Sequence, residues 1–138
     1  MATIEPVPTL VDTNVLLDVF TEDQRWARWS ATAITDAAAA GRLVVNPVIY
    51  TELAPRFPEI EELDAALAGY VREPLPWTAA YLAGRAHARY RRAGGSRRST
   101  LPDFFIGAHA AIERMALLTR DTSRYSAYFP TVELISPA

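Results

Sequence analysis

The sequence contains no cysteine and no lysine, and both absences narrow the chemistry available to its 138 residues. Without cysteine there is no disulfide, no thiolate nucleophile and no cysteine-based zinc or iron–sulfur site, which agrees with a reducing cytosol. No apolar run approaches the roughly 18 residues that a membrane span needs. Residues 1–8 lack the basic and apolar regions of a signal peptide. We therefore expect a cytoplasmic protein that does not enter a membrane.

The composition is that of a globular domain, because 50% of the residues are hydrophobic and 22% are charged. A chain of this length forms one domain that buries about two-thirds of the surface exposed on unfolding. No repeat, low-complexity tract or linker divides it. We expect residues 1–138 to form a single domain.

The charges are distributed unevenly, which is more informative about partners than the net charge of −2. All 14 basic residues are arginines, a bias that a GC-rich genome would also produce. No acid occurs between Pro74 and Pro102, yet this window holds six arginines: Arg85, Arg89, Arg91, Arg92, Arg97 and Arg98. This clustering predicts a polarised surface.

Short apolar runs alternate with helical segments, a pattern typical of a parallel sheet with helices on both faces. The runs that predict strands are residues 8–11, 43–46, 70–73, 116–119 and 132–135. Three of them are apolar on both faces, as buried parallel strands are: 8–11, 43–46 and 116–119.

Helix starts are recognisable from capping residues. Thr21 with Gln24 forms a capping box that predicts a helix to about Ala40. Asn46-Pro47 predicts the start of a helix that carries Glu52. Further helices are expected from Pro58, from Pro76 to Ala93, and from Pro102, the last with an apolar stripe: Phe104, Ala108, Ala111, Ile112 and Met115.

Four acids stand at the ends of these predicted elements. Asp12 directly follows the first strand, and Asp121 lies two residues beyond the fourth. Glu52 lies in the helix after the second strand, and Asp103 in the first turn of its helix. In an open parallel sheet such positions share the carboxyl edge, where ligands bind at the point where the strand order reverses. If the first strand is central with the fourth beside it, the four carboxylates meet.

Four adjacent carboxylates raise one another's pKa unless a cation compensates. Oxygen ligands without histidine or cysteine suit Mg²⁺ or Mn²⁺, and such sites are typical of phosphoryl chemistry. Each acid also has a simpler interpretation: Asp103 as a helix-start acid, Asp121 as a turn residue and Glu52 as a solvated one. Asp12 has no such simple interpretation, because an aspartate directly after a buried strand would lose part of its hydration without gaining a partner. We assign the other acids to the surface, including Asp18, Asp23, Asp36 and Asp64.

These residues resemble the PIN-domain pattern, specifically that of VapC-type toxin ribonucleases, over nearly the whole chain. The resemblance rests on four motifs in order: residues 10–17 (LVDTNVLL), Glu52, residues 102–108 (PDFFIGA) and residues 118–121 (LTRD) with the aromatic segment that follows. It implies a three-layer α/β/α sandwich with a five-stranded parallel sheet. Two departures are His109, at a helix position usually small, and the paired Phe104 and Phe105, of which we expect one or the other to narrow the pocket.

The resemblance further implies a divalent-metal-dependent endoribonuclease that is the toxin of a toxin–antitoxin pair and cuts structured RNA (transfer or ribosomal). Asp12, Asp103 and Asp121 would hold Mg²⁺ or Mn²⁺, and Glu52 would orient or deprotonate the attacking water. Thr13 and Thr119 would be supporting hydroxyls, and Asn14 would brace the turn around Asp12.

The arginine clusters and the resemblance together predict the partners. RNA phosphates would contact Arg85, Arg89 and Arg92 on one helix face, and Arg97 and Arg98 in the loop before Asp103; a solvated helix face is the alternative. The resemblance implies a hydrophobic groove for an antitoxin, in which we place Trp26 or Trp29, and a homodimer. Core packing is the commoner reason for a helix that is apolar on two sides.

Other functions remain open. A PIN nuclease of RNA processing, or a non-catalytic RNA-binding protein, would show the same residues. A phosphoacceptor receiver or a haloacid-dehalogenase-like phosphatase normally needs a lysine near its acids, which this chain lacks. The phosphatase pattern also requires an aspartate where this sequence has Asn14.

Overall fold

Five short strands form one parallel sheet in the computed structural model, which describes residues 6–95 and 101–137. Their order is β3-β2-β1-β4-β5, and all four pairings are parallel. The strands are β1 (Thr9–Val11), β2 (Leu43–Val45), β3 (Val71–Arg72), β4 (Ala116–Leu118) and β5 (Leu134–Ile135). The predicted five-stranded parallel sheet is confirmed, and each strand is one or two residues shorter than its apolar run.

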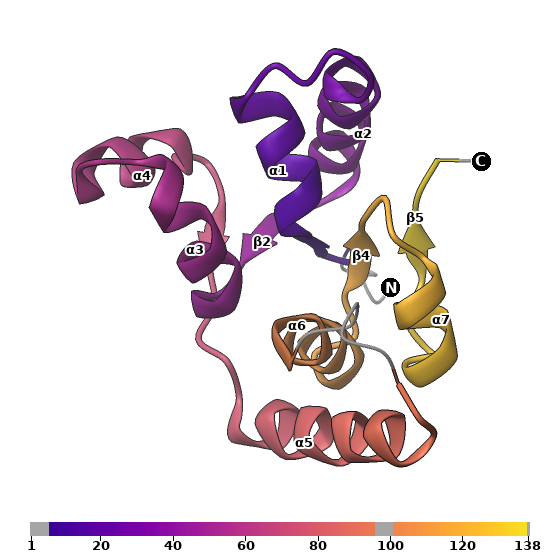
Figure 1. Ribbon diagram of the computed structural model, residues 1–138. Coiled ribbons are helices and arrows are strands. Elements are labelled where there is room, and N and C mark those ends of the chain that lie inside the picture. Colours follow the sequence, from indigo (N-terminus) through magenta and orange to yellow (C-terminus); the bar gives the residue numbers. More distant parts are fainter. Residues whose placement is uncertain (1–5, 96–100, 138) are drawn as a thin grey trace, which may run out of the picture.

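Helices cover both faces of this sheet, so the predicted three-layer α/β/α architecture is also confirmed (Figure 1). Figure 1 shows α1 and α2 on one face and α5, α6 and α7 on the other, with α3 and α4 beyond β2. The helices are α1 (Thr13–Phe20), α2 (Ala27–Ala40), α3 (Pro47–Leu53), α4 (Ile60–Ala66), α5 (Trp77–Arg92), α6 (Leu101–Ile112) and α7 (Ser123–Tyr128). None of those within the described ranges is long and apolar enough to cross a membrane.

The central strands determine where the site lies. Every residue of β1, β2 and β4 is buried, because helices cover both faces of these strands. β1 lies between β2 and β4, and the chain reaches β4 only after completing the β2–β3 side. The strand order therefore reverses between β1 and β4, and a crevice is expected at their carboxyl ends.

The helix starts are only partly as predicted. Asn46 caps α3 as expected: its side-chain oxygen accepts a hydrogen bond from Ile49 N at 2.9 Å. The capping box at Thr21 is wrong, since α2 begins only at Ala27. The Thr21 hydroxyl instead donates to the Leu17 carbonyl oxygen at 2.7 Å, at the end of α1. Asp23 accepts from the backbone amides of Arg25 and Trp26 in the turn between the two helices.

Two other helical details differ from the prediction. α4 begins at Ile60 rather than Pro58, with Glu59 as its N-cap and Glu62 completing a capping box. The short helix α7 was not predicted, because its six residues are too few for a hydrophobic period to be visible.

More residues of α6 are buried than the predicted apolar stripe contains. Ile106 to Ala110 are all buried, whereas Ile112 is 39% exposed and does not belong to the buried face. The helix packs closely against α5 and contacts α7 and β4, so it is enclosed on most sides. A Cβ on Gly107 would overlap the ring of Phe129, so only glycine allows this close approach.

Candidate active site

A pocket of about 260 Å³ lies at the carboxyl ends of β1 and β4, where the strand order reverses. All four acids predicted from the sequence line this pocket, although they come from four separate segments of the chain. Its lining residues are Asp12, Thr13, Asn14, Leu17, Glu52, Asp103, Asp121 and Tyr125. The fold therefore brings the predicted carboxylates together.

Asp12 is the most enclosed of these acids, with only 4% of its surface exposed. Its Oδ1 accepts a hydrogen bond from Thr13 N at 2.8 Å, which makes it the N-cap of α1. Its Oδ2 accepts from the hydroxyls of Thr119 at 2.7 Å and Tyr125 at 3.0 Å. The carboxylate is thus held in one orientation by groups from three parts of the chain.

Burial outweighs these hydrogen bonds in setting the ionisation of Asp12. Removal from water raises the pKa of Asp12 to about 6, and the nearby charge of Asp103 acts in the same direction. The hydrogen bonds from Thr119, Tyr125 and Thr13 oppose the rise, because they stabilise the ionised form. A cation in the pocket would offset both the burial and the repulsion from Asp103.

Glu52 reaches the pocket from α3. The Thr13 hydroxyl donates a hydrogen bond to its Oε1 at 2.8 Å, so the start of α1 fixes a side chain on a neighbouring helix. Burial raises the pKa of Glu52, the bond from Thr13 lowers it, and the charge of Asp103 raises it further. A carboxylate whose pKa is raised in this way is better suited to accept a proton from water.

Thr119 and Asn14 connect the two halves of the site. The Thr119 hydroxyl donates to Asp12 and accepts a hydrogen bond from Asp121 N at 3.1 Å. Asn14 Oδ1 accepts from Arg120 N at 3.3 Å, while its amide lies 3.5 Å from both Asp12 Oδ2 and Thr119 Oγ1. These contacts couple the turn after β1 to the turn after β4.

Asp103 and Asp121 are half-buried at the rim of the pocket. Asp103 lies in the first turn of α6, close enough for its charge to raise the pKa of Asp12, Glu52 and Tyr125. Within residues 6–95 and 101–137, no three acidic or histidine side chains converge closely enough to form a ready-made metal site. The acids therefore share a pocket without forming a closed set of ligands.

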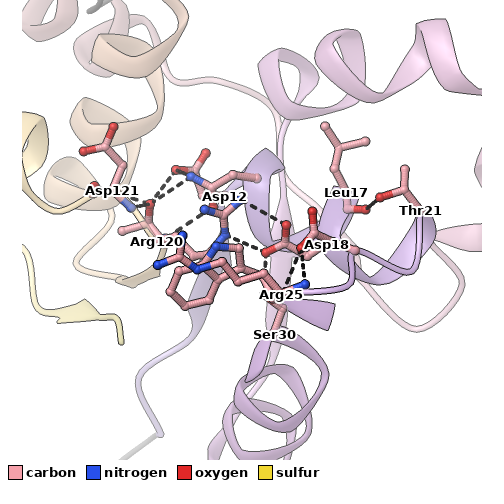
Figure 2. A network of polar contacts seen from close by, with 12 residues as sticks. Asp12, Leu17, Asp18, Thr21, Arg25, Ser30, Arg120 and Asp121 are labelled. Carbon is pink, nitrogen blue, oxygen red and sulfur yellow. Dashed lines mark hydrogen bonds and ion pairs between the residues drawn. The ribbon is translucent and has the colours of Figure 1, made fainter. Parts of the chain in front are cut away.

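Asp18 corrects one expectation, since it is buried with 3% exposure and does not lie on the surface. Its carboxylate pairs with Arg120, whose Nε lies 2.6 Å from Oδ2 and Nη2 3.0 Å from Oδ1. Ser30 on α2 donates to the same Oδ2 at 2.7 Å. Arg120 directly precedes Asp121. These contacts of Asp18 therefore connect the turn that carries Asp121 with helices α1 and α2 (Figure 2).

Tyr125 is a site residue that the sequence analysis missed. It is buried on α7, donates to Asp12 and lines the pocket. Burial raises its pKa well above the ordinary value, and the charges of Asp12, Asp103 and Glu52 add to this, so the phenol remains a hydrogen-bond donor. Its position four residues after Asp121 was the available signal, but this spacing alone does not separate a site tyrosine from a core tyrosine.

The pair Phe104 and Phe105 does not narrow the pocket, because neither residue lines it. Phe104 is buried in an aromatic cluster with His87, Tyr90, Tyr128 and Phe129. His109 is buried, and its Nδ1 lies 3.0 Å from Asn46 Nδ2. Burial lowers the pKa of His109, so it is a neutral core residue.

The predicted partner residues lie in different surroundings. Arg85, Arg89 and Arg92 are exposed on α5, whereas Arg97 and Arg98 lie outside the described residues. Trp26 is partly buried, with the guanidinium carbons of Arg25 and Arg120 each 5.0 Å from its ring centre. Trp29 packs partly against the core and makes an edge contact with Trp26.

Comparisons with known proteins agree with this architecture. A family model described as PIN domain matches residues 9–129. Three similar solved structures are VapBC2 from Rickettsia felis bound to a promoter DNA fragment (13% identity, 94% of this chain and 98% of that chain, TM-score 0.73), VapBC-1 from nontypeable Haemophilus influenzae (14%, 94% and 97%, 0.71) and a toxin–antitoxin complex from Klebsiella pneumoniae (22%, 94% and 98%, 0.69). At these identities the likeness shows a shared fold. No curated protein sequence matches the chain.

Proposed function

Since this chain belongs to the PIN-domain family of nucleases, we propose that it is a divalent-metal-dependent endoribonuclease and the toxin of a toxin–antitoxin pair. Its substrate would be structured RNA, such as transfer or ribosomal RNA. The observation that carries the proposal is the pocket at the β1–β4 reversal, into which four chain segments bring Asp12, Glu52, Asp103 and Asp121. Acid-only sites of this kind serve phosphoryl chemistry.

The donor set fits Mg²⁺ or Mn²⁺, because these hard ions prefer oxygen ligands and the pocket offers carboxylates without histidine. Asp12, Asp103 and Asp121 would hold the ion. Mg²⁺ usually keeps several waters and takes few protein ligands, so a pocket without a closed ligand set is compatible with it. When bound, such an ion stabilises charge on the phosphate and lowers the pKa of bound water.

The protein's own residues would hold the reacting groups in place. Glu52, oriented by the Thr13 hydroxyl, would accept a proton from the attacking water. Thr119 and Tyr125 keep the Asp12 carboxylate directed into the pocket, and Asn14 braces the adjoining turn. Arg120 would act indirectly, by fixing the turn that carries Asp121.

RNA would bind through exposed arginines on α5, namely Arg85, Arg89 and Arg92, and through Arg97 and Arg98, which precede Asp103 in the sequence. The absence of acid between Pro74 and Pro102 supports this, since phosphate contacts need an uncompensated positive surface. We also propose that residues 1–138 form a single domain. The protein would act in the cytoplasm and would form a homodimer. The similar structure from Klebsiella pneumoniae is a toxin–antitoxin complex, which supports an antitoxin partner contacting Trp26 or Trp29.

The test is cleavage of total bacterial RNA by the wild type and Asp12→Asn, each with Mn²⁺, Mg²⁺ or EDTA. Discrete fragments are expected only from the wild type with metal. Asp64→Asn is a matched control, because it removes one carboxylate from an exposed ion pair with Arg72 outside the pocket. Equal cleavage by Asp12→Asn, or cleavage in EDTA, would contradict the proposal.

A further inference from the structure

Two aromatic side chains on α5 are exposed to a degree that packing does not explain. Trp77 is 91% exposed and Tyr81 is 72% exposed, although both are large and apolar. They border a shallow cleft of about 510 Å³ between α5 and the end of α6, lined by Trp77, Thr78, Tyr81, Leu82, Arg85 and Ile112. Exposed apolar surface of this kind marks an interaction site.

The same helix face also carries positive charge. Trp77, Tyr81 and Arg85 follow one another at four-residue intervals and therefore lie along one side of the helix. Ala79, Ala83 and Ala86 form the opposite, buried side. α5 contains no acid from end to end, so the arginines have no partner on their own helix.

This face leads toward the acidic pocket. Near the carboxyl end of α5, the Arg89 guanidinium lies 5.8 Å from the ring centre of Tyr128 on α7. Tyr90 packs against Phe104, the residue that follows Asp103. α5 thus runs from the exposed aromatics to the helices that carry Tyr125 and Asp103 (Figure 1).

We propose that the face of α5 formed by Trp77, Tyr81 and Arg85 is a stacking site for single-stranded RNA, which guides the strand toward the acidic pocket. Bases would stack on the two aromatic rings, and Arg85 with Arg89 would contact the phosphates. Proteins that bind single strands combine aromatic stacking with a positive groove in this manner. The inference rests on the proposed function and identifies an unpaired RNA segment as the part of the substrate that is bound.

Charge complementarity selects RNA over a second copy of the chain. In a two-fold symmetric contact the same surface meets itself, so Arg85 and its neighbouring arginines would face their own copies. The helix offers no acid to neutralise them. A polyanion with exposed bases satisfies both the positive charge and the aromatic rings.

The experiment measures binding of a fluorescein-labelled single-stranded RNA of about 12 nucleotides and of the duplex of the same sequence. Asp12→Asn in EDTA serves as the parent, so that binding is separated from cleavage. The single strand should bind more tightly than the duplex, whose bases are already stacked. Trp77→Ala and Tyr81→Ala should each weaken single-strand binding roughly 5-fold to 150-fold, since stacking contributes about 1–3 kcal/mol per base.

Controls distinguish stacking from charge and from assembly. Arg85→Gln should lower the salt dependence of binding by about 0.7 in the log–log slope, as one lost phosphate contact predicts. Ile60→Ala and Arg42→Gln, which change an exposed apolar and an exposed basic residue elsewhere, should leave binding unchanged. Light scattering on the same samples should show that Trp77→Ala keeps the oligomeric state of its parent.

Unchanged RNA binding in both aromatic variants overturns the inference. So does a Trp77→Ala variant that loses only its ability to form dimers, which would assign the face to a second copy. The proposed nuclease function is judged separately, by whether the wild type cleaves RNA with metal.

Discussion

Replacing Asp12 with asparagine should make the metal-free protein more stable while abolishing cleavage. Burial raises the pKa of Asp12 from its ordinary value of 3.8 to about 6, so the folded protein holds a carboxylate that is costly to ionise. This rise corresponds to at most ~3 kcal/mol of destabilisation at neutral pH. Asparagine forfeits about 1 kcal/mol because it accepts less well from Thr119 and Tyr125. The expected net gain is about 1–2 kcal/mol.

The pH dependence of stability tests whether the cost of ionising Asp12 causes this gain. A group whose pKa is higher in the folded state than in the unfolded state binds more protons when folded, so its contribution to stability falls as pH rises. For Asp12 this fall occurs between pH 3.8 and about 6. The stability that Asp12→Asn gains over the wild type should therefore be absent below pH 3.8 and complete above about pH 6.

Thermal unfolding in EDTA across this pH range is the assay. A gain of 1–2 kcal/mol should raise the Tm of the variant by about 3–6 °C at neutral pH, given roughly 3 °C per kcal/mol for a chain of this size. Added Mn²⁺ should raise the Tm of the wild type but not that of the variant, because only the wild type binds it well. A variant that is less stable than the wild type at neutral pH in EDTA would refute the reasoning.

Three further predictions concern the surroundings of the pocket. Tyr125→Phe removes a donor that lowers the pKa of Asp12, so the acidic limb of the pH–rate profile of metal-dependent RNA cleavage should move to higher pH; an unmoved limb would show that Asp12 does not govern it. Asp18→Asn breaks a buried ion pair and should lower the free energy of urea unfolding by about 2–4 kcal/mol, against less than about 1 kcal/mol for the exposed Asp64→Asn, and equal losses would contradict this difference in burial. Gly107→Ala should destabilise by about 1–3 kcal/mol through its clash with Phe129, whereas Gly84→Ala, with open space around it, should stabilise α5 by about 0.5–1 kcal/mol; calorimetry on both variants would test the opposite signs.

The amino-acid sequence by itself determined the strands and the edge of the sheet to which each acid belongs. Runs such as Leu43–Val45 are apolar on both faces, a local property that is typical of a buried parallel strand. Asp12 follows such a run directly and Asp121 lies two residues beyond another, so their position at the carboxyl edge depends on chain order alone. The start of α3 at Asn46-Pro47 was equally local, because a cap acts on the next three residues.

Only the tertiary structure decided the features that depend on partners distant in the sequence. Asp18 has the local pattern of a surface acid, and its burial is possible because Arg120, 102 residues away, neutralises it. Tyr125 became a site residue only when α7 placed its hydroxyl against Asp12. The Thr21 hydroxyl was available to either neighbouring helix, and the bend between α1 and α2 assigned it to the end of the first. Local propensities select elements, whereas the pairing of buried polar groups depends on which elements pack together.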